Sequence, residues 1–179
     1  MKDEIKGQLD ALFADEAAQK MKAEQKRGAE AERQAAFLEQ FGRVTDDVIA
    51  PAFEEFAVYL NPQGWGGLVK RESEAPAGQN YRPAFSHAPS APESVSLVFS
   101  HATRAITGIN KGDQPRFMIR CDKVKRLVHF HETTPSMSGP AGSAKLDEVT
   151  ADYLQEKLVT YFKKLMHDAR PHDEQWRGA

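Results

Sequence analysis

The chain has 179 residues, of which 40% are apolar and 28% are charged, so it can bury one modest core while part of it stays solvated or packs against a partner. Its single cysteine, Cys121, excludes an intramolecular disulfide, and the apolar run at residues 56–60 is far shorter than the roughly 20 residues that span a bilayer. The net charge is −2 and the first residues alternate in charge without an apolar run, so we expect a cytoplasmic protein without membrane contact.

Residues 2–60 are predicted to be helical, since few helix-breaking residues other than Gly28, Gly42 and Pro51 occur in them. An apolar patch comes first, with the i, i+4, i+7, i+8 spacing of one helical face: Ile5, Leu9, Leu12 and Phe13. Over about residues 14–36 the apolar face of the helix consists mainly of alanines, which offer little surface to bury. Two arrangements stay open for this stretch, a helical hairpin that bends near Gly28 or an arm that pairs with another chain.

A continuous coiled coil is not supported for this segment. The heptad line through its apolar patch runs on to polar side chains, namely Glu16, Gln19, Lys26 and Glu30. The patch of Ile5, Leu9, Leu12 and Phe13 is the candidate surface for short-range self-association or for docking of a protein partner.

A stronger apolar stripe follows and predicts core packing. It consists of Phe37 or Leu38, Phe41, Val44, Val48, Ala52, Phe56 and Tyr59. Pro51 lies inside the stripe and predicts a kink or a new helix start, because its ring clashes with the carbonyl of Asp47. A turn at residues 61–64 then ends the helix.

Alternating apolar residues predict the strands that follow. A first strand is expected at residues 65–71 and a short one at 104–109. Three further strands place these side chains toward the core: Val95, Leu97 and Phe99, then Phe117, Ile119 and Cys121, then Val124, Val128 and Phe130. A tight turn at Asp122-Lys123 joins the last two strands, and residues 134–144 form a flexible connector.

The last predicted element is an amphipathic helix with Thr150 as its N-cap. The order of helices, strands and a helix predicts an α+β fold: a long N-terminal helical segment, a small antiparallel sheet of four or five strands, and a C-terminal helix packed on the sheet. We expect a partly solvated helical arm at residues 1–36, a domain at 37–170 with a flexible loop at 73–93, and a tail at 171–179.

The outer face of the predicted sheet is basic. Residues 101–131 contain seven lysines and arginines against two acidic residues, and the predicted alternation places a set of them away from the core: Arg116, Arg120, Lys125, His129 and His131. These five are the candidate ligand-binding residues, for an anion or a small molecule. The alternative is a structural face that the acidic N-terminal helices cover.

His129 and His131 are also candidate metal ligands, because residues i and i+2 of a strand project from one face. A metal would need a third ligand, and His101, His87 and Glu132 are the candidates. The alternative is a pair of solvated histidines.

The sequence offers no catalytic motif. The glycines near Trp65 lack the spacing and the following helix of a phosphate loop, and Ser100 and His101 point to opposite faces of a strand. We therefore expect a non-enzymatic protein-interaction or self-association module of the bacterial cytosol type, with no cofactor and with a protein or a second copy as its partner. A ligand- or metal-binding protein is the alternative, and nucleic-acid binding is unlikely because the outer face lacks aromatic side chains.

Overall fold

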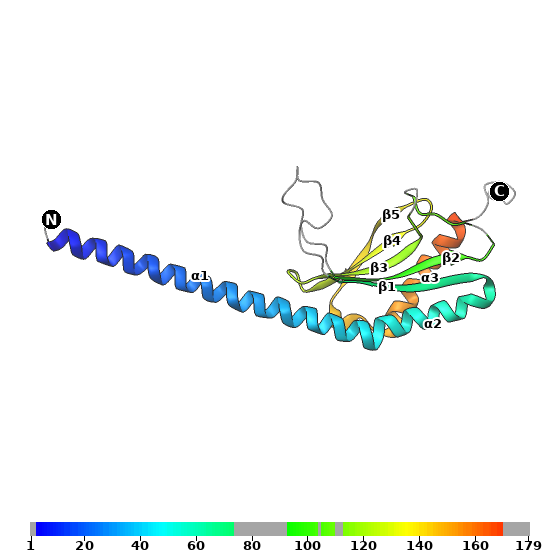
Figure 1. Ribbon diagram of the computed structural model, residues 1–179, viewed down its shortest axis with the longest axis horizontal. Helices are drawn as coiled ribbons and strands as arrows, with labels where there is room; N and C mark the ends of the chain where they lie inside the picture. Colours follow the sequence, from blue (N-terminus) through cyan, green and yellow to red (C-terminus); the bar gives the residue numbers. More distant parts are fainter. Residues whose placement is uncertain (1–2, 74–92, 104, 110–112, 170–179) are drawn as a thin grey trace.

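The computed structural model describes residues 3–73, 93–103, 105–109 and 113–169, and within the first ten residues it describes the side chain of Lys6 alone (Figure 1). Helix α1 (Asp3–Val44) continues through a π-helical turn (Thr45–Ile49) into α2 (Ala50–Leu60). Five strands and a last helix follow: β1 (Trp65–Glu72), β2 (Ser94–His101), β3 (Arg116–Asp122), β4 (Leu127–Thr133), β5 (Ser138–Ala144) and α3 (Ala151–Asp168).

The five strands form one sheet in the order β1-β2-β3-β4-β5, and each strand pairs antiparallel with the next. Helices α2 and α3 and the end of α1 lie against one face of this sheet, while the rest of α1 projects from the body (Figure 1). The predicted α+β fold with a long N-terminal helix, an antiparallel sheet and a C-terminal helix is confirmed.

The core lies between the sheet and the helices and is rich in aromatic side chains. Tyr161, Phe41, Phe53, Phe99, Phe117 and Phe130 are among its largest fully buried members. Helix α2 approaches β1 so closely that a Cβ atom at Gly67 would lie 2.6 Å from the Cβ atom of Ala57. This close contact fixes α2 over β1 and leaves its last turn beside α3.

The predicted stripe of α1 and α2 is confirmed in part: Phe37, Phe41 and Ala52 are buried, and Val44, Val48 and Phe56 pack partly buried against the core. Tyr59 is 76% exposed, however, and the structure also buries residues outside the predicted stripe, namely Thr45, Ile49, Phe53, Ala57 and Leu60. The π-helical turn is wider than an α-helical turn, so the centre of the buried face moves along the chain by about one residue after it. The predicted helix start at Pro51 is confirmed, since Pro51 lies in the first turn of α2.

Three predictions for the strands were wrong. Residues 105–109 form no strand, and residues 138–144 form β5 rather than a flexible connector. Val124 is 66% exposed because the β3–β4 turn takes up residues 123–126, where Arg126 adopts the left-handed conformation at φ 56°. Pairing with β4 holds β5 in the sheet although its sequence has little strand propensity.

Helix α3 is fixed at both of its ends. Thr150 caps it as predicted, accepting a hydrogen bond from the backbone N–H of Tyr153 at 3.2 Å. At the other end Asp168 accepts hydrogen bonds from the hydroxyls of Thr134, at 2.5 Å, and Ser136. Burial raises the pKa of Asp168, but these hydrogen bonds outweigh it and hold the pKa below its usual value.

The predicted flexible loop at residues 73–93, apart from its two end residues, and the predicted tail at 171–179 lie outside the described residues.

Candidate interaction sites

The arm, defined here as residues 3–36 of α1, is a single uninterrupted helix. It continues through Gly28, so the alternative of a hairpin that bends there is wrong. A Cβ atom at Gly28 would meet no other atom within 4 Å, which shows that no other element packs there. Phe37 is the first buried residue of α1, and the arm is therefore solvated where its side chains are described.

Two large apolar side chains are exposed together near the outer end of the arm. Leu12 and Phe13 are each 64% exposed. They lie about 38 Å along the helix from Phe37, at a rise of ~1.5 Å per residue. Ile5 and Leu9, the other members of the predicted patch, lie in α1, but their side chains are outside the described part of the chain.

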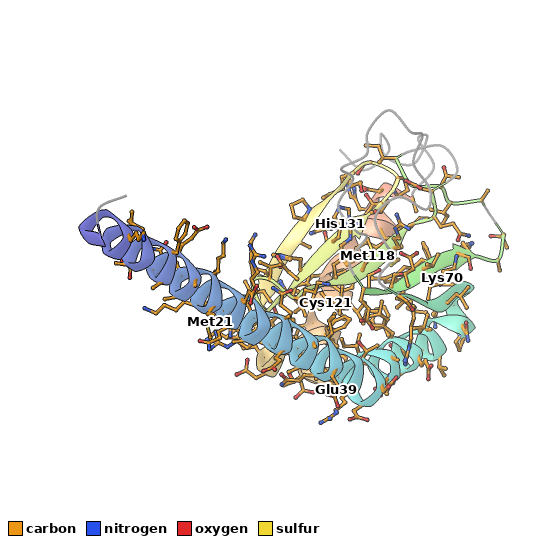
Figure 2. The ribbon with its side chains drawn as sticks, turned by 60° about the vertical axis from the view of Figure 1, so that its left-hand side comes forward. Met21, Glu39, Lys70, Met118, Cys121 and His131 are labelled. Atoms are coloured by element: carbon orange, nitrogen blue, oxygen red, sulfur yellow. The ribbon has the colours of Figure 1, made fainter. Side chains whose placement is uncertain are left out.

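The outer face of the sheet is the one that α2 and α3 do not cover. Across it the register aligns Lys70, Ser96, Met118 and His131 on four neighbouring strands. Figure 2 shows Lys70, Met118 and His131 spread over this sheet, while α1 leads away from it. The alternative in which the N-terminal helices cover this face is therefore wrong for the described residues.

This face concentrates positive charge. Among the described residues no ion pair involves Arg116, Arg120 or Lys70. The Nε atom of Arg116 and the Nδ1 atom of His131 are both buried without a hydrogen-bond partner. Burial lowers the pKa of His131, and the positive charges of Arg120 and Arg116 lower it further. An anion placed here would supply the missing negative charge.

The other two candidate ligand-binding residues lie at the margin of this face or off it. The Nε2 atom of His129 lies 3.2 Å from a carboxylate oxygen of Asp122. Burial raises the pKa of Asp122, but the backbone N–H of Lys125 and the imidazole of His129 outweigh it and lower the pKa. Lys125 lies in the β3–β4 turn, not on the outer face as predicted, because the turn begins after Asp122.

Two apolar side chains in the middle of this face are buried. Val98 and Met118 are only 6% and 4% exposed. Leu68, which pairs with Val98 and shares the outer face with Lys70, is 58% exposed. The described surface of the outer face therefore combines cationic and imidazole groups with the exposed side chain of Leu68.

The histidine pair has no third metal ligand among the described residues, where no cluster of three His, Cys, Asp or Glu side chains could hold a metal ion. His101 lies at the end of β2 against the ring of Trp65, with the ring centres 4.9 Å apart. Glu132 points to the opposite face from His131 and lies 2.7 Å from the Nζ atom of Lys164. His87 lies outside the described residues.

An apolar groove between α2, the start of β1 and α3 was not predicted from the sequence. It has a volume of about 340 Å³ and is lined by Phe56, Tyr59, Leu60, Gln63, Trp65, Val159, Phe162, Lys163 and Met166. The signal that could have revealed it is the surplus of apolar residues on both helices. Val159 and Met166 of α3 lie outside the stripe that covers the sheet, and Tyr59 faces them from α2 once the π-helical turn shifts the register.

Comparisons with protein-family models, with curated proteins and with solved structures give no match. No helix in the described ranges has the length and apolar character needed to cross a membrane.

Proposed function

We propose that the protein is a non-enzymatic interaction module that uses its arm to associate with a second copy or with another protein. The observation that carries this proposal is the course of α1, which leaves the body as one solvated helix with Leu12 and Phe13 exposed near its outer end.

The physical chemistry of a long exposed helix supports this use. Most helices in proteins are stabilised by packing of an apolar face, and a polar helix alone in water is marginal. Burying Leu12 and Phe13 against a partner would contribute about 1.5–3 kcal/mol for each side chain. Binding would therefore stabilise the arm as well as the complex.

The test is the molar mass of the full chain over a concentration series, measured by light scattering. We expect the wild-type chain to associate and the double variant Leu12→Asp/Phe13→Asp to remain monomeric. Each 1.4 kcal/mol of association free energy that the substitutions remove raises the dissociation constant about tenfold. Both side chains are already exposed, so the substitutions leave the fold of the body unchanged.

Ala18→Asp is the matched control for this experiment. Ala18 is exposed and, at about 100° per residue, lies about 120° around the helix from Leu12 and about 140° from Phe13, on the side away from both. Association like that of the wild type in Ala18→Asp, together with a monomeric double variant, supports the proposal. A monomeric wild type that captures no protein through the arm contradicts it.

A second candidate function is anion binding by the outer face of the sheet. The specific observation in its favour is the pair of buried, unpartnered nitrogen atoms on Arg116 and His131, beside an arginine without an ion pair among the described residues. Both functions can coexist, since the arm and this face lie on different parts of the molecule.

A further inference from the structure

We propose that the receptor for the arm is the groove between α2 and α3 of a second copy of this chain, so that two molecules exchange arms. This inference rests on the proposed function and adds to it the partner and the surface that the arm contacts.

The groove has the shape and chemistry of a site for apolar side chains from a helix. Its floor is preformed by aromatic rings: the ring centres of Phe56 and Phe162 are 5.9 Å apart, and those of Trp65 and Phe162 are 5.0 Å apart. Its rim exposes Val159, at 43%, and Met166, at 45%. A helix that carries neighbouring large apolar residues fits such a groove, as amphipathic helices do in many complexes.

The arm carries such residues, and the groove brings together three of the large apolar side chains that the described body exposes. Leu12 and Phe13 are adjacent and lie in a long helix, so both enter a partner surface from the same turn. On the body, Tyr59, Val159 and Met166 are exposed and line the groove, while the other exposed large apolar side chains lie outside it: Val58, Leu68, Ile109, Val124 and Met137. Docking the arm in the groove would therefore cover both apolar surfaces at once.

The charges of the two surfaces are complementary. Residues 3–16 contain five acidic residues and one lysine, a net charge of −4. Lys163 is the charged residue among those that line the groove, and it forms no ion pair with another described residue, whereas Lys164 pairs with Glu132 and Lys157 lies over the ring of Phe130. The turn of α2 that faces Lys163 across the groove, residues 56–60, is uncharged. Lys163 therefore attracts the acidic outer part of the arm.

The arm cannot reach the groove of its own chain. Leu12 lies about 38 Å from Phe37 along a continuous helix, while α2 leads from the same point in the opposite direction toward the groove. The occupant must come from another molecule. Since each chain has one arm and one groove, reciprocal exchange closes a two-fold dimer and doubles the buried area.

The experiment uses full-length chains with one introduced cysteine each, because the native Cys121 is buried. Glu16→Cys places a thiol one helical turn from Leu12, and Thr160→Cys places one beside Val159. Mixing the two variants with a short bismaleimide should give a cross-linked dimer. The matched control replaces Glu16→Cys by Ala18→Cys, on the side of the arm away from Leu12 and Phe13, and should cross-link several-fold less.

A groove variant separates this inference from the proposed function. Val159→Asp/Met166→Asp removes apolar surface and repels the acidic arm at two positions that are already partly exposed, and it should raise the dissociation constant of the dimer at least about tenfold. Val58→Asp, at an exposed position of α2 outside the groove, should leave it unchanged.

The outcomes are distinct. Loss of the dimer in the groove variant, together with the selective cross-link, supports arm exchange. If the groove variant associates like the wild type while Leu12→Asp/Phe13→Asp is monomeric, arm exchange is wrong and the proposed function stands. If the wild type stays monomeric at every concentration, arm exchange is wrong, whatever other protein the arm binds.

Discussion

At the scale of single residues, His131 is a titratable group of the outer face whose protonation depends on the charges around it. Its pKa lies below the usual value because of burial and because Arg120 and Arg116 are nearby. The unfolded chain therefore takes up this proton at a higher pH than the folded chain. The contribution of His131 to the free energy of unfolding is therefore fully present above about pH 6.5, the ordinary histidine pKa, and is lost as the pH falls below that value.

Anion binding should reverse this trend, because a negative charge beside the imidazole favours its protonated form. We expect phosphate or sulfate to raise the melting temperature more at about pH 5.5 than at about pH 7.5, where the imidazole is neutral. Arg120→Ala should weaken anion binding about tenfold, the effect of one lost charge-assisted hydrogen bond. His131→Gln should remove most of the pH dependence of the anion effect on the melting temperature.

Lys125→Ala is the matched control for this prediction, because Lys125 carries the same charge but lies in the β3–β4 turn. Thermal unfolding with and without the anion gives the measurement. Equal anion effects in Arg120→Ala, Lys125→Ala and the wild type would show that the outer face is not an anion site.

At the scale of elements, the arm is a helix that its own sequence must sustain between its outer end and the body. Gly28 is the weakest interior position, since glycine costs about 1 kcal/mol relative to alanine in a helix. Gly28→Ala should increase the helical signal in circular dichroism, and Gly28→Pro should decrease it by breaking the helix.

Both substitutions should leave the unfolding of the body unchanged, because nothing lies within 4 Å of a Cβ atom at Gly28. Circular dichroism for the arm and thermal unfolding for the body give the two measurements. A large change in the melting temperature of the body in Gly28→Ala would mean that the arm packs against it.

The elements also show which parts of the fold can be predicted from sequence patterns. Thr150 and the apolar face of α3 are local signals, and the structure contains both. Strands β2, β3 and β4 follow their alternation, and Cys121 is buried as expected. Strand β5 could not be predicted, because its residues, Ser138–Ala144, have little strand propensity and depend on a neighbouring strand for pairing.

The site was predictable in part for the same physical reasons. Alternation placed Arg116, Arg120 and His131 on one face, but it continued through Val124 and Lys125 where the chain in fact turns. The groove between α2 and α3 depends on a π-helical turn, and an average period of 3.6 residues cannot reveal one extra residue in a turn.

At the scale of the whole molecule, a two-layer body carries a helix that extends far beyond it (Figure 1). One face of the sheet is closed by α2 and α3, and the charged outer face is not covered by any described helix. Self-association through the arm requires that the arm stay away from its own body. The extended shape of the isolated molecule is therefore the central claim.

Small-angle X-ray scattering of the Leu12→Asp/Phe13→Asp variant tests this claim most directly, because that variant should be monomeric. The 34 residues of the arm should extend the distance distribution about 50 Å beyond that of the body, as a long tail of low weight. A compact distribution without the tail would show that the arm folds onto the body, and would contradict the account.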